Sequence, residues 1–336
     1  MNAPAAKLVA VWLFVCAGMV VAMMIIGAIT RLTDSGLSMV EWRPLIGAWP
    51  PTDAAEWQRL LDLYRQTSEY KLANAGMSLE EFKTIFWWEF IHRLWGRLIG
   101  IVFALPFVFF LLTKRIPSGF TPHLVALFLL GGLQGVIGWW MVKSGFVDRT
   151  DVSQYRLTAH LGMAFGILGY LLWLALLLIA PRLPIPNAPR RLAWGTLAAV
   201  SITILAGGLV AGLKAGLTYN SWPLMDGEFF PTGALELSPW WLNGFENLAT
   251  VQLDHRLLAY ASVLMVGWLW LAMRRSAVTL RAQLAANAMA MLVIVQVTLG
   301  IATLLLVVPM SLAVMHQAGA AVLFSLTLWV VYELSS

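Results

Sequence analysis

Long apolar stretches dominate the chain and predict helices that cross a lipid bilayer. A hydrocarbon core about 30 Å thick needs about 20 apolar residues in helical conformation. Eight stretches reach this length, at residues 8–29, 91–113, 123–142, 158–180, 192–213, 251–273, 284–306 and 311–332. The pattern predicts an all-α integral membrane protein with eight transmembrane helices. No small-residue cleavage site follows the first stretch, so we expect a retained helix rather than a signal peptide.

Two long connections, at residues 30–90 and 214–250, separate these stretches. Residues 53–66 carry apolar side chains at helical spacing. Ser78 and Glu81 have the spacing of a capping box, which predicts a second helix running toward Trp88. We expect both helices to lie along the membrane interface over the mouth of the bundle. Most of the 17 Trp residues are expected to anchor the ends of the spans.

The charged residues are divided unevenly between the two sides of the predicted membrane. Only 12% of residues are charged and 60% are hydrophobic, which is outside the range of soluble proteins. The N-terminus and the short connections 114–122, 181–191 and 274–283 contain basic residues and no acidic residue. These basic residues are Lys7, Lys114, Arg115, Arg182, Arg190, Arg191, Arg274, Arg275 and Arg281. Because Lys and Arg mark the cytoplasmic side, both termini are predicted to be cytoplasmic and both long loops external.

The net charge of +5 does not indicate nucleic-acid binding, because no run of Lys or Arg exceeds two residues. The single cysteine, Cys16, can form no internal disulfide. Composition therefore points to the lipid bilayer as the partner of this chain, and not to nucleic acid.

The second half of the chain repeats landmarks of the first. The matched residues are Gly27 with Gly207, His92 with His255, Gln134 with Gln296, Gly138 with Gly300, His160 with His316 and Trp173 with Trp329. Their common order predicts a tandem duplication of a four-helix unit, with halves at 1–180 and 181–336. The first half carries the outer loop 30–90. Because four spans preserve orientation, we expect two four-helix bundles related by a pseudo-two-fold axis along the membrane normal.

Four of the five histidines are predicted to lie at one depth. They are His92, His160, His255 and His316, each near the start of an even-numbered span. Those spans all run inward, so the four imidazoles are expected near the outer face. A single histidine in a membrane is often only a hydrogen-bonding residue. Four at one depth indicate ligation. The fifth, His123, is expected on the surface at the cytoplasmic edge.

Two facing histidines in a four-helix bundle form an axial pair for a haem iron. This predicts one site from His92 and His160 and a second from His255 and His316. Zinc or copper usually needs three or four ligands. A di-iron bundle needs two Glu-x-x-His motifs, and this chain has one.

Arginines follow the first histidine of each predicted pair. Arg93 follows His92 and Arg256 follows His255. Either arginine could pair with haem propionates or serve as an ordinary interfacial residue.

The two halves differ at one chemically important position. Glu89 precedes His92 by three residues and shares its helical face, whereas Gln252 precedes His255. A carboxylate can exchange protons and an amide cannot. This predicts acid–base chemistry at the first site and a redox cofactor at the second. A solvated carboxylate at the helix mouth is the simpler alternative for Glu89.

Several motifs occur in a fixed order along nearly the whole chain. They are Gly27-x-x-Thr30-Arg31-Leu32-Thr33-x-Ser35-Gly36-Leu37-Ser38, Glu89-Phe90-Ile91-His92-Arg93-x-x-Gly96, Thr158-Ala159-His160, Asp254-His255-Arg256 and Met315-His316-Gln317. In these motifs the chain resembles the haem A synthase family. The long first outer loop is similar to that of the proteobacterial and mitochondrial branch. Gram-positive members carry an outer-loop cysteine pair, which this chain lacks.

The resemblance implies an oxidoreductase that converts the C8 methyl group of haem O to a formyl group through hydroxylated intermediates. The product, haem A, serves cytochrome oxidase. The family pattern implies that His255 and His316 ligate a haem b cofactor, that His92 and His160 bind the substrate haem O, and that Glu89 is catalytic. It also implies a bacterial inner-membrane location, an electron acceptor, and haem O synthase as the supplier of the substrate. The sequence leaves a homo-oligomer open.

Other functions remain as alternatives at this stage. A di-haem b-type electron carrier linked to quinol usually places its haems at opposite membrane faces, unlike the histidines here. A transporter with parallel repeats needs polar residues near the midplane, where this chain has Gln134, Gln296 and scattered Ser and Thr. A purely structural subunit would not need four aligned histidines.

Overall fold

The computed structural model describes residues 3–41, 46–146 and 151–335. Eight helices in these ranges are long and apolar enough to cross a membrane. They are α1 (Ala3–Leu32), α4 (Leu79–Leu112), α5 (Thr121–Lys143), α6 (Gln154–Ile179), α7 (Arg190–Gly212), α9 (Leu248–Arg274), α10 (Leu280–Leu305) and α11 (Met310–Leu334). The predicted all-α membrane protein with eight spans is confirmed.

Shorter elements lie in the connections between these helices. They are η1 (Ile46–Ala48), α2 (Ala54–Tyr64), α3 (Ser68–Leu72), η2 (Ser144–Phe146), η3 (Ala215–Leu217), η4 (Trp240–Leu242) and α8 (Asn243–Glu246). An isolated β-bridge joins Met225 and Glu228 in the second outer loop.

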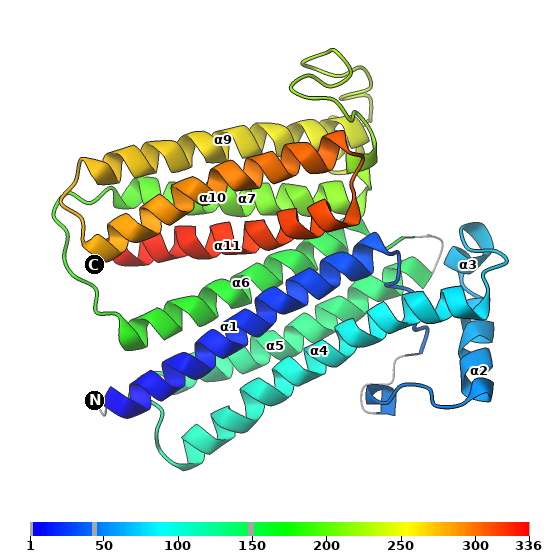
Figure 1. The fold of residues 1–336 in the computed structure, drawn as a ribbon, viewed down its shortest axis with the longest axis horizontal. Coiled ribbons are helices and arrows are strands. Elements are labelled where there is room, and N and C mark those ends of the chain that lie inside the picture. The colour runs from blue at the N-terminus through cyan, green and yellow to red at the C-terminus, as the bar shows by residue number, and fades with distance from the viewer. Residues whose placement is uncertain (1–2, 42–45, 147–150, 336) are drawn as a thin grey trace.

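Helix α4 is longer than the predicted span. The sequence suggested a helix opening at Ser78 and a separate span beginning at residue 91, but the structure has one continuous helix of 34 residues. The predicted capping box is confirmed, since the side chains of Ser78 and Glu81 each accept from the other's backbone N–H. The division into two helices was wrong because residues 79–92 contain no Gly or Pro that would interrupt the helix. At 1.5 Å per residue the helix is about 50 Å long, so its outer end extends well beyond the other spans (Figure 1).

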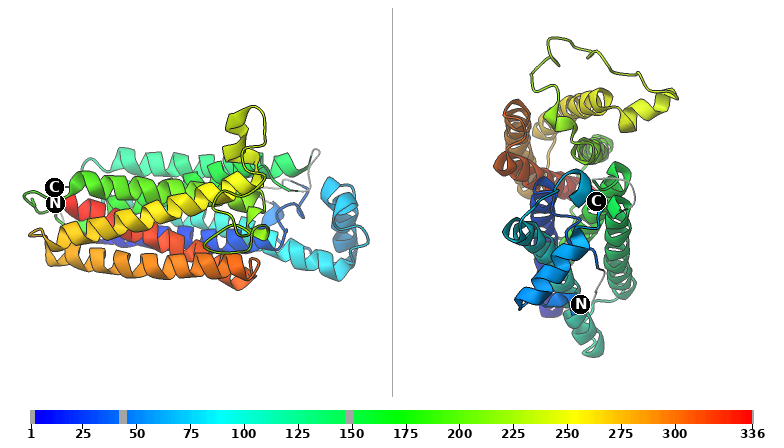
Figure 2. Two further views of the ribbon diagram at one scale, coloured as in Figure 1. Left: turned by 90° about the horizontal axis from the view of Figure 1, so that it is seen from above. Right: turned by 90° about the vertical axis from the view of Figure 1, so that its right-hand side faces the viewer.

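The spanning helices pack in two rings. In the first ring α1 and α5 each contact both α4 and α6; in the second, α7 and α10 each contact both α9 and α11. Contacts of α6 with α7, of α1 with α11, and of α6 with α11 join the rings. Both termini lie at one end of the bundle, and α2 and α3 lie at the other (Figures 1 and 2).

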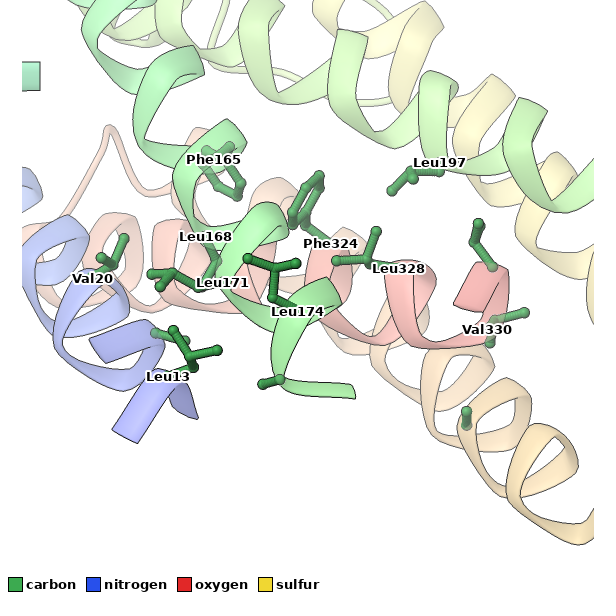
Figure 3. Close-up of a cluster of buried hydrophobic side chains, with 14 of the residues drawn as sticks. Leu13, Val20, Phe165, Leu168, Leu171, Leu174, Leu197, Phe324, Leu328 and Val330 are labelled. Carbon is green, nitrogen blue, oxygen red and sulfur yellow. The ribbon is translucent and has the colours of Figure 1, made fainter. Parts of the chain in front are cut away.

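The core between the rings is apolar and closely packed. Figure 3 shows Leu168 and Leu171 of α6 beside Phe324 and Leu328 of α11, all of them buried. A Cβ on Gly169 would lie 3.2 Å from Cζ of Phe324, so a small residue allows α6 and α11 to approach. Close van der Waals contact is the main attraction between helices in lipid, and small residues permit it.

A cluster of ion pairs joins the rings at the outer end. Arg31 Nη1 lies 2.8 Å from Asp34 and 3.4 Å from Asp151. Lys214 Nζ lies 3.1 Å from Asp34 and 3.2 Å from Asp151. Asp34 and Lys214 follow α1 and α7 at positions 180 residues apart, and both have positive φ, 47° and 53°. The ends of the two helices therefore have the same backbone turn and opposite charges.

The first outer loop forms a packed cap on the extended end of α4. The cap cluster consists of the buried residues Leu61, Tyr64, Phe82, Phe86 and Phe90. The predicted helix at 53–66 is confirmed as α2. Its apolar face packs on α4, because the side chains of Phe82 and Phe86 offer an apolar surface there. The expectation that this face lies in the membrane interface was therefore wrong.

Candidate functional site

Each of the four candidate histidines packs against a glycine of a neighbouring helix. A Cβ on Gly27 would lie 3.3 Å from His92 Nε2, one on Gly138 2.9 Å from His160 Cε1, one on Gly207 3.1 Å from His255 Cε1 and one on Gly300 2.9 Å from His316 Cε1. These distances are too short for a methyl group to fit without moving the ring. The glycines therefore form a seat beside each imidazole that any larger residue would fill.

The glycine seats place all four histidines at the same end of the bundle. The glycines lie in the last third of α1, α5, α7 and α10, and the histidines lie in the first half of α4, α6, α9 and α11. These two sets of helices are antiparallel, so all four contacts fall at the end opposite the chain termini (Figure 1). The rings of His92 and His160 are close enough to interact electrostatically, and so are those of His255 and His316. The structure thus brings together the two predicted pairs.

His123 lies apart from these sites. It is exposed at the start of α5, and its Nδ1 atom lies 2.6 Å from the Tyr170 hydroxyl. The prediction of a surface residue is confirmed.

Polar groups next to the histidines come from the helices that carry the glycine seats. Gln134 Nε2 donates to the His160 carbonyl (3.0 Å), and Gln296 Nε2 donates to the His316 carbonyl (2.9 Å). Each glutamine lies one helical turn before the glycine seat on the same helix. The sequence marked these glutamines only as landmarks of the repeat. The structure shows that they contact the candidate ligands.

Glu89 is buried and holds the first outer loop. Only 2% of the residue is exposed. Its Oε2 atom accepts hydrogen bonds from the Ser38 hydroxyl and the Met39 backbone N–H, each at 2.7 Å. Its Oε1 atom forms an ion pair with Arg93, one turn further along α4. The alternative of a solvated carboxylate is thereby excluded.

Arg93 completes this contact, which we call the first arginine clamp (Glu89, Arg93 and the loop residues they bind). Its Nη2 atom donates to the Met39 carbonyl at 2.9 Å, and its Nη1 atom lies 3.4 Å from the Glu41 carbonyl. A carboxylate with three donors, one of them cationic, is held strongly in its charged form.

A second arginine clamp occurs at the corresponding positions of the other half. Arg256 Nη2 donates to the Tyr219 carbonyl (2.8 Å) and Nη1 donates to the Ser221 carbonyl (3.0 Å). Gln252 Oε1 accepts from Arg256 at 2.8 Å, and Gln252 Nε2 donates to the carbonyls of Ala215 and Thr218. Residues 219 and 221 follow Met39 and Glu41 by 180 residues. The equivalent arginines thus bind equivalent loop carbonyls.

The clamps assign the two arginines a role that the sequence reasoning missed. Arg93 and Arg256 were predicted to be interfacial arginines or partners of haem propionates, and the structure shows both binding loop carbonyls. The pairing with propionates stays a prediction. The signal that could have located the clamps is the equal spacing of each arginine and its loop in the two halves.

The residues at each site fit a haem better than a bare metal ion. Within the described residues, no group of three or more His, Cys, Asp or Glu side chains could hold a metal ion. A haem iron needs only two axial ligands from the protein, and each half supplies two imidazoles seated on glycines. His160 Nδ1 and the Oε1 atoms of Gln134 and Gln296 are buried without hydrogen-bond partners in the described chain. Such groups are costly unless a function requires them.

Comparison with known proteins gives matches over nearly the whole chain. The COX15-CtaA family model, described as cytochrome oxidase assembly protein, matches residues 10–328. A relative from Nitrosospira multiformis, named heme A synthase, is 52% identical over 333 residues, covering 98% of this chain and 94% of the relative. A heme A synthase from Rhodospirillum centenum is 53% identical over 337 residues, covering 99% and 90%. The chain therefore belongs to the COX15-CtaA family of cytochrome oxidase assembly proteins, the family of the haem A synthases.

Proposed function

We propose that the protein is a haem A synthase that oxidises the C8 methyl group of haem O to a formyl group through hydroxylated intermediates. Haem O is its substrate, and haem A is its product. His92 and His160 bind the substrate haem in the first half. His255 and His316 hold a haem b in the second half, and this cofactor supplies one-electron redox chemistry when bound.

The observation that carries this proposal is the difference between the two arginine clamps. Both clamps use an arginine to bind the same two loop carbonyls. Only the first contains a carboxylate, Glu89, where the second has Gln252. An exchange that leaves the structural contact in place and adds a proton-accepting group points to chemistry in the first half.

Glu89 is suited to hold and move a proton at its carboxylate oxygens. Conversion of a methyl group to an aldehyde removes hydrogen from carbon, and the loss of water from a gem-diol requires a proton on the departing oxygen. The carboxylate can accept a proton at one step and return it at another. Its burial excludes exchange with bulk water, and Arg93 with the Ser38 hydroxyl keeps it oriented.

The proposed division of labour follows the repeat. We propose that residues 1–180 and 181–336 are duplicated units related by an axis along the membrane normal. The matched packing of helices and the clamps 180 residues apart support this relation. With cytoplasmic termini, the four histidines lie near the outer face of the bacterial inner membrane. The basic residues of the short connections support that orientation.

Replacement of Glu89 tests the proposal. Glu89→Gln keeps the size of the side chain and removes the proton-accepting group. We expect cells that depend on this variant to accumulate haem O or a hydroxylated intermediate, measured by pigment extraction and mass spectrometry. The matched control is Gln252→Glu, which places a carboxylate in the second clamp and should leave haem A formation intact. A normal yield of haem A from Glu89→Gln would overturn the proposed role.

A further inference from the structure

The four histidines differ in how their ring nitrogens are held. In the second half, His255 Nδ1 lies 3.1 Å from the Thr203 carbonyl, and His316 Nδ1 lies 3.1 Å from Gln296 Nε2. In the first half, His160 Nδ1 is buried without a hydrogen-bond partner, and neither ring nitrogen of His92 makes a hydrogen bond to any residue that the structure describes. Polar contacts thus fix both rings in the second half and neither ring in the first.

The cause at His316 lies in one small residue. A Cβ on Gly319 would overlap the Gln296 amide oxygen, so Gln296 can occupy its position only because residue 319 is glycine. The corresponding residue in the first half is Met163, 156 positions earlier. There Gln134 contacts the His160 carbonyl and does not reach the ring. Glycine at 319 therefore accounts for the extra contact to the imidazole.

The cause at His255 lies in α7. Gly207 leaves room for the ring one turn after Thr203, so the ring reaches the Thr203 carbonyl. The Thr203 hydroxyl also lies 2.8 Å from Ser262 Oγ and donates to the Leu258 carbonyl, which ties α7 to the histidine-bearing helix α9. The corresponding residue in the first half is Met23, whose side chain offers no such tie.

A contact at Nδ1 has two effects on a histidine that binds iron through Nε2. It fixes the rotation of the ring, and an acceptor at the Nδ1 proton makes the imidazole a stronger electron donor. The Gln296 amide presents either its nitrogen or its oxygen to Nδ1, since these two atoms exchange places on rotation. Its oxygen is buried and has no partner within the described residues.

We infer that Gln296, in the space left by Gly319, is a positioning residue that fixes His316 and lowers the reduction potential of the haem b bound there. The first half lacks equivalent contacts, so its imidazoles stay free to turn as substrate enters and product leaves. This inference rests on the proposed function, in which only the second half holds a resident cofactor. A fixed ring suits a permanent ligand, whereas a free ring suits a ligand that must exchange its haem.

Substitution of the two corresponding glutamines tests this inference in the purified full-length protein. Gln296→Leu should shift the low-field EPR signal of the low-spin haem b, because that signal depends on the orientation of the imidazole planes. It should also raise the midpoint potential in a redox titration. Gln296→Glu, which keeps an acceptor for the Nδ1 proton, should lower the potential below that of the wild type. The matched control, Gln134→Leu, should leave both properties of haem b unchanged.

The outcomes separate this inference from the proposed function. Wild-type EPR signals and potentials in both Gln296 variants would overturn the inference while haem b itself remained in place. An equal shift from Gln134→Leu would overturn it too. Should Gln296→Leu fail to retain haem, the lowered potential of Gln296→Glu decides the question. Absence of haem b from the wild-type protein would instead overturn the proposed function.

Discussion

The two outer loops are held by the same arginine contact and are otherwise built differently. Arg93 and Arg256 bind corresponding loop carbonyls. The first loop adds α2 and α3, whose apolar side chains are buried in the cap cluster. The second projects sideways from the bundle (Figure 2) and exposes large aromatic residues, including Trp240 at 77% and Phe229 at 69%. The clamp is common to both halves, and the packed cap belongs only to the half with Glu89.

This comparison indicates which features carry a division of labour. Helix packing, glycine seats and clamps are alike in the two halves, so they explain binding of a haem but not different uses of it. The differences are confined to a carboxylate, two contacts at Nδ1 and the cap. The predictions below test whether those few differences separate a substrate site from a cofactor site.

The largest expected effect comes from removal of the histidines themselves. His255→Ala or His316→Ala should abolish the low-spin haem b spectrum, because an axial ligand is lost. His92→Ala or His160→Ala should keep that spectrum and lose haem A formation. Reduced-minus-oxidised spectra and pyridine haemochrome analysis of the purified variants measure both properties. Equal spectral loss from all four variants would indicate two equivalent cofactor haems, as in a di-haem electron carrier.

The clamps should differ in stability when their arginines are removed. Arg93→Leu leaves the buried Glu89 carboxylate without its cation, and breaking such a pair costs about 3–5 kcal/mol. Arg256→Leu leaves only neutral groups unpaired, which costs about 1–3 kcal/mol. Denaturant titration in detergent measures the free energy of unfolding. The double variant Glu89→Gln with Arg93→Leu should recover part of the loss, and no recovery would argue against a buried charge as its cause.

The smallest expected effect is a pH dependence confined to the cap. Glu69 in α3 is buried, and this burial raises its pKa from 4.5 to about 8, helped by the negative charges of Asp34, Glu89 and Asp151. The Tyr64 hydroxyl donates to Glu69 at 3.0 Å, which opposes the shift. Because the pKa is raised in the folded cap, protonated Glu69 stabilises the cap at low pH, and this stability is lost as the pH rises through about 8.

Hydrogen exchange of α2 and α3 at about pH 6 and about pH 9, corrected for the intrinsic rates, tests this expectation. Protection should fall at the higher pH in the wild type and stay constant in Glu69→Gln. The spanning helices serve as an internal reference. A pH dependence that persists in Glu69→Gln would assign the effect to another group.

Much of the architecture could be predicted from the sequence. The eight spans are visible because lipid demands long apolar helices. The four histidines are aligned because the even-numbered spans share one direction. The continuous α4 was missed because a span is recognised by its apolar part, and the polar turns between Leu79 and Trp88 fall outside it. The packing of α2 on α4 was missed because an apolar helical face does not specify whether protein or membrane covers it.

The sequence by itself determined the class of protein, the eight spans, the two histidine pairs and the exchange of Glu89 for Gln252. These follow from composition and from spacing along helices, which are local properties. Only the tertiary structure decided what those residues contact: that Arg93 and Arg256 bind loop carbonyls, that each histidine sits on a glycine, and that Gln296 reaches a ring that Gln134 does not. Such contacts depend on distances of about 3 Å between helices far apart in the chain. Side-chain volumes across the interface, such as Gly319 against Met163, set those distances.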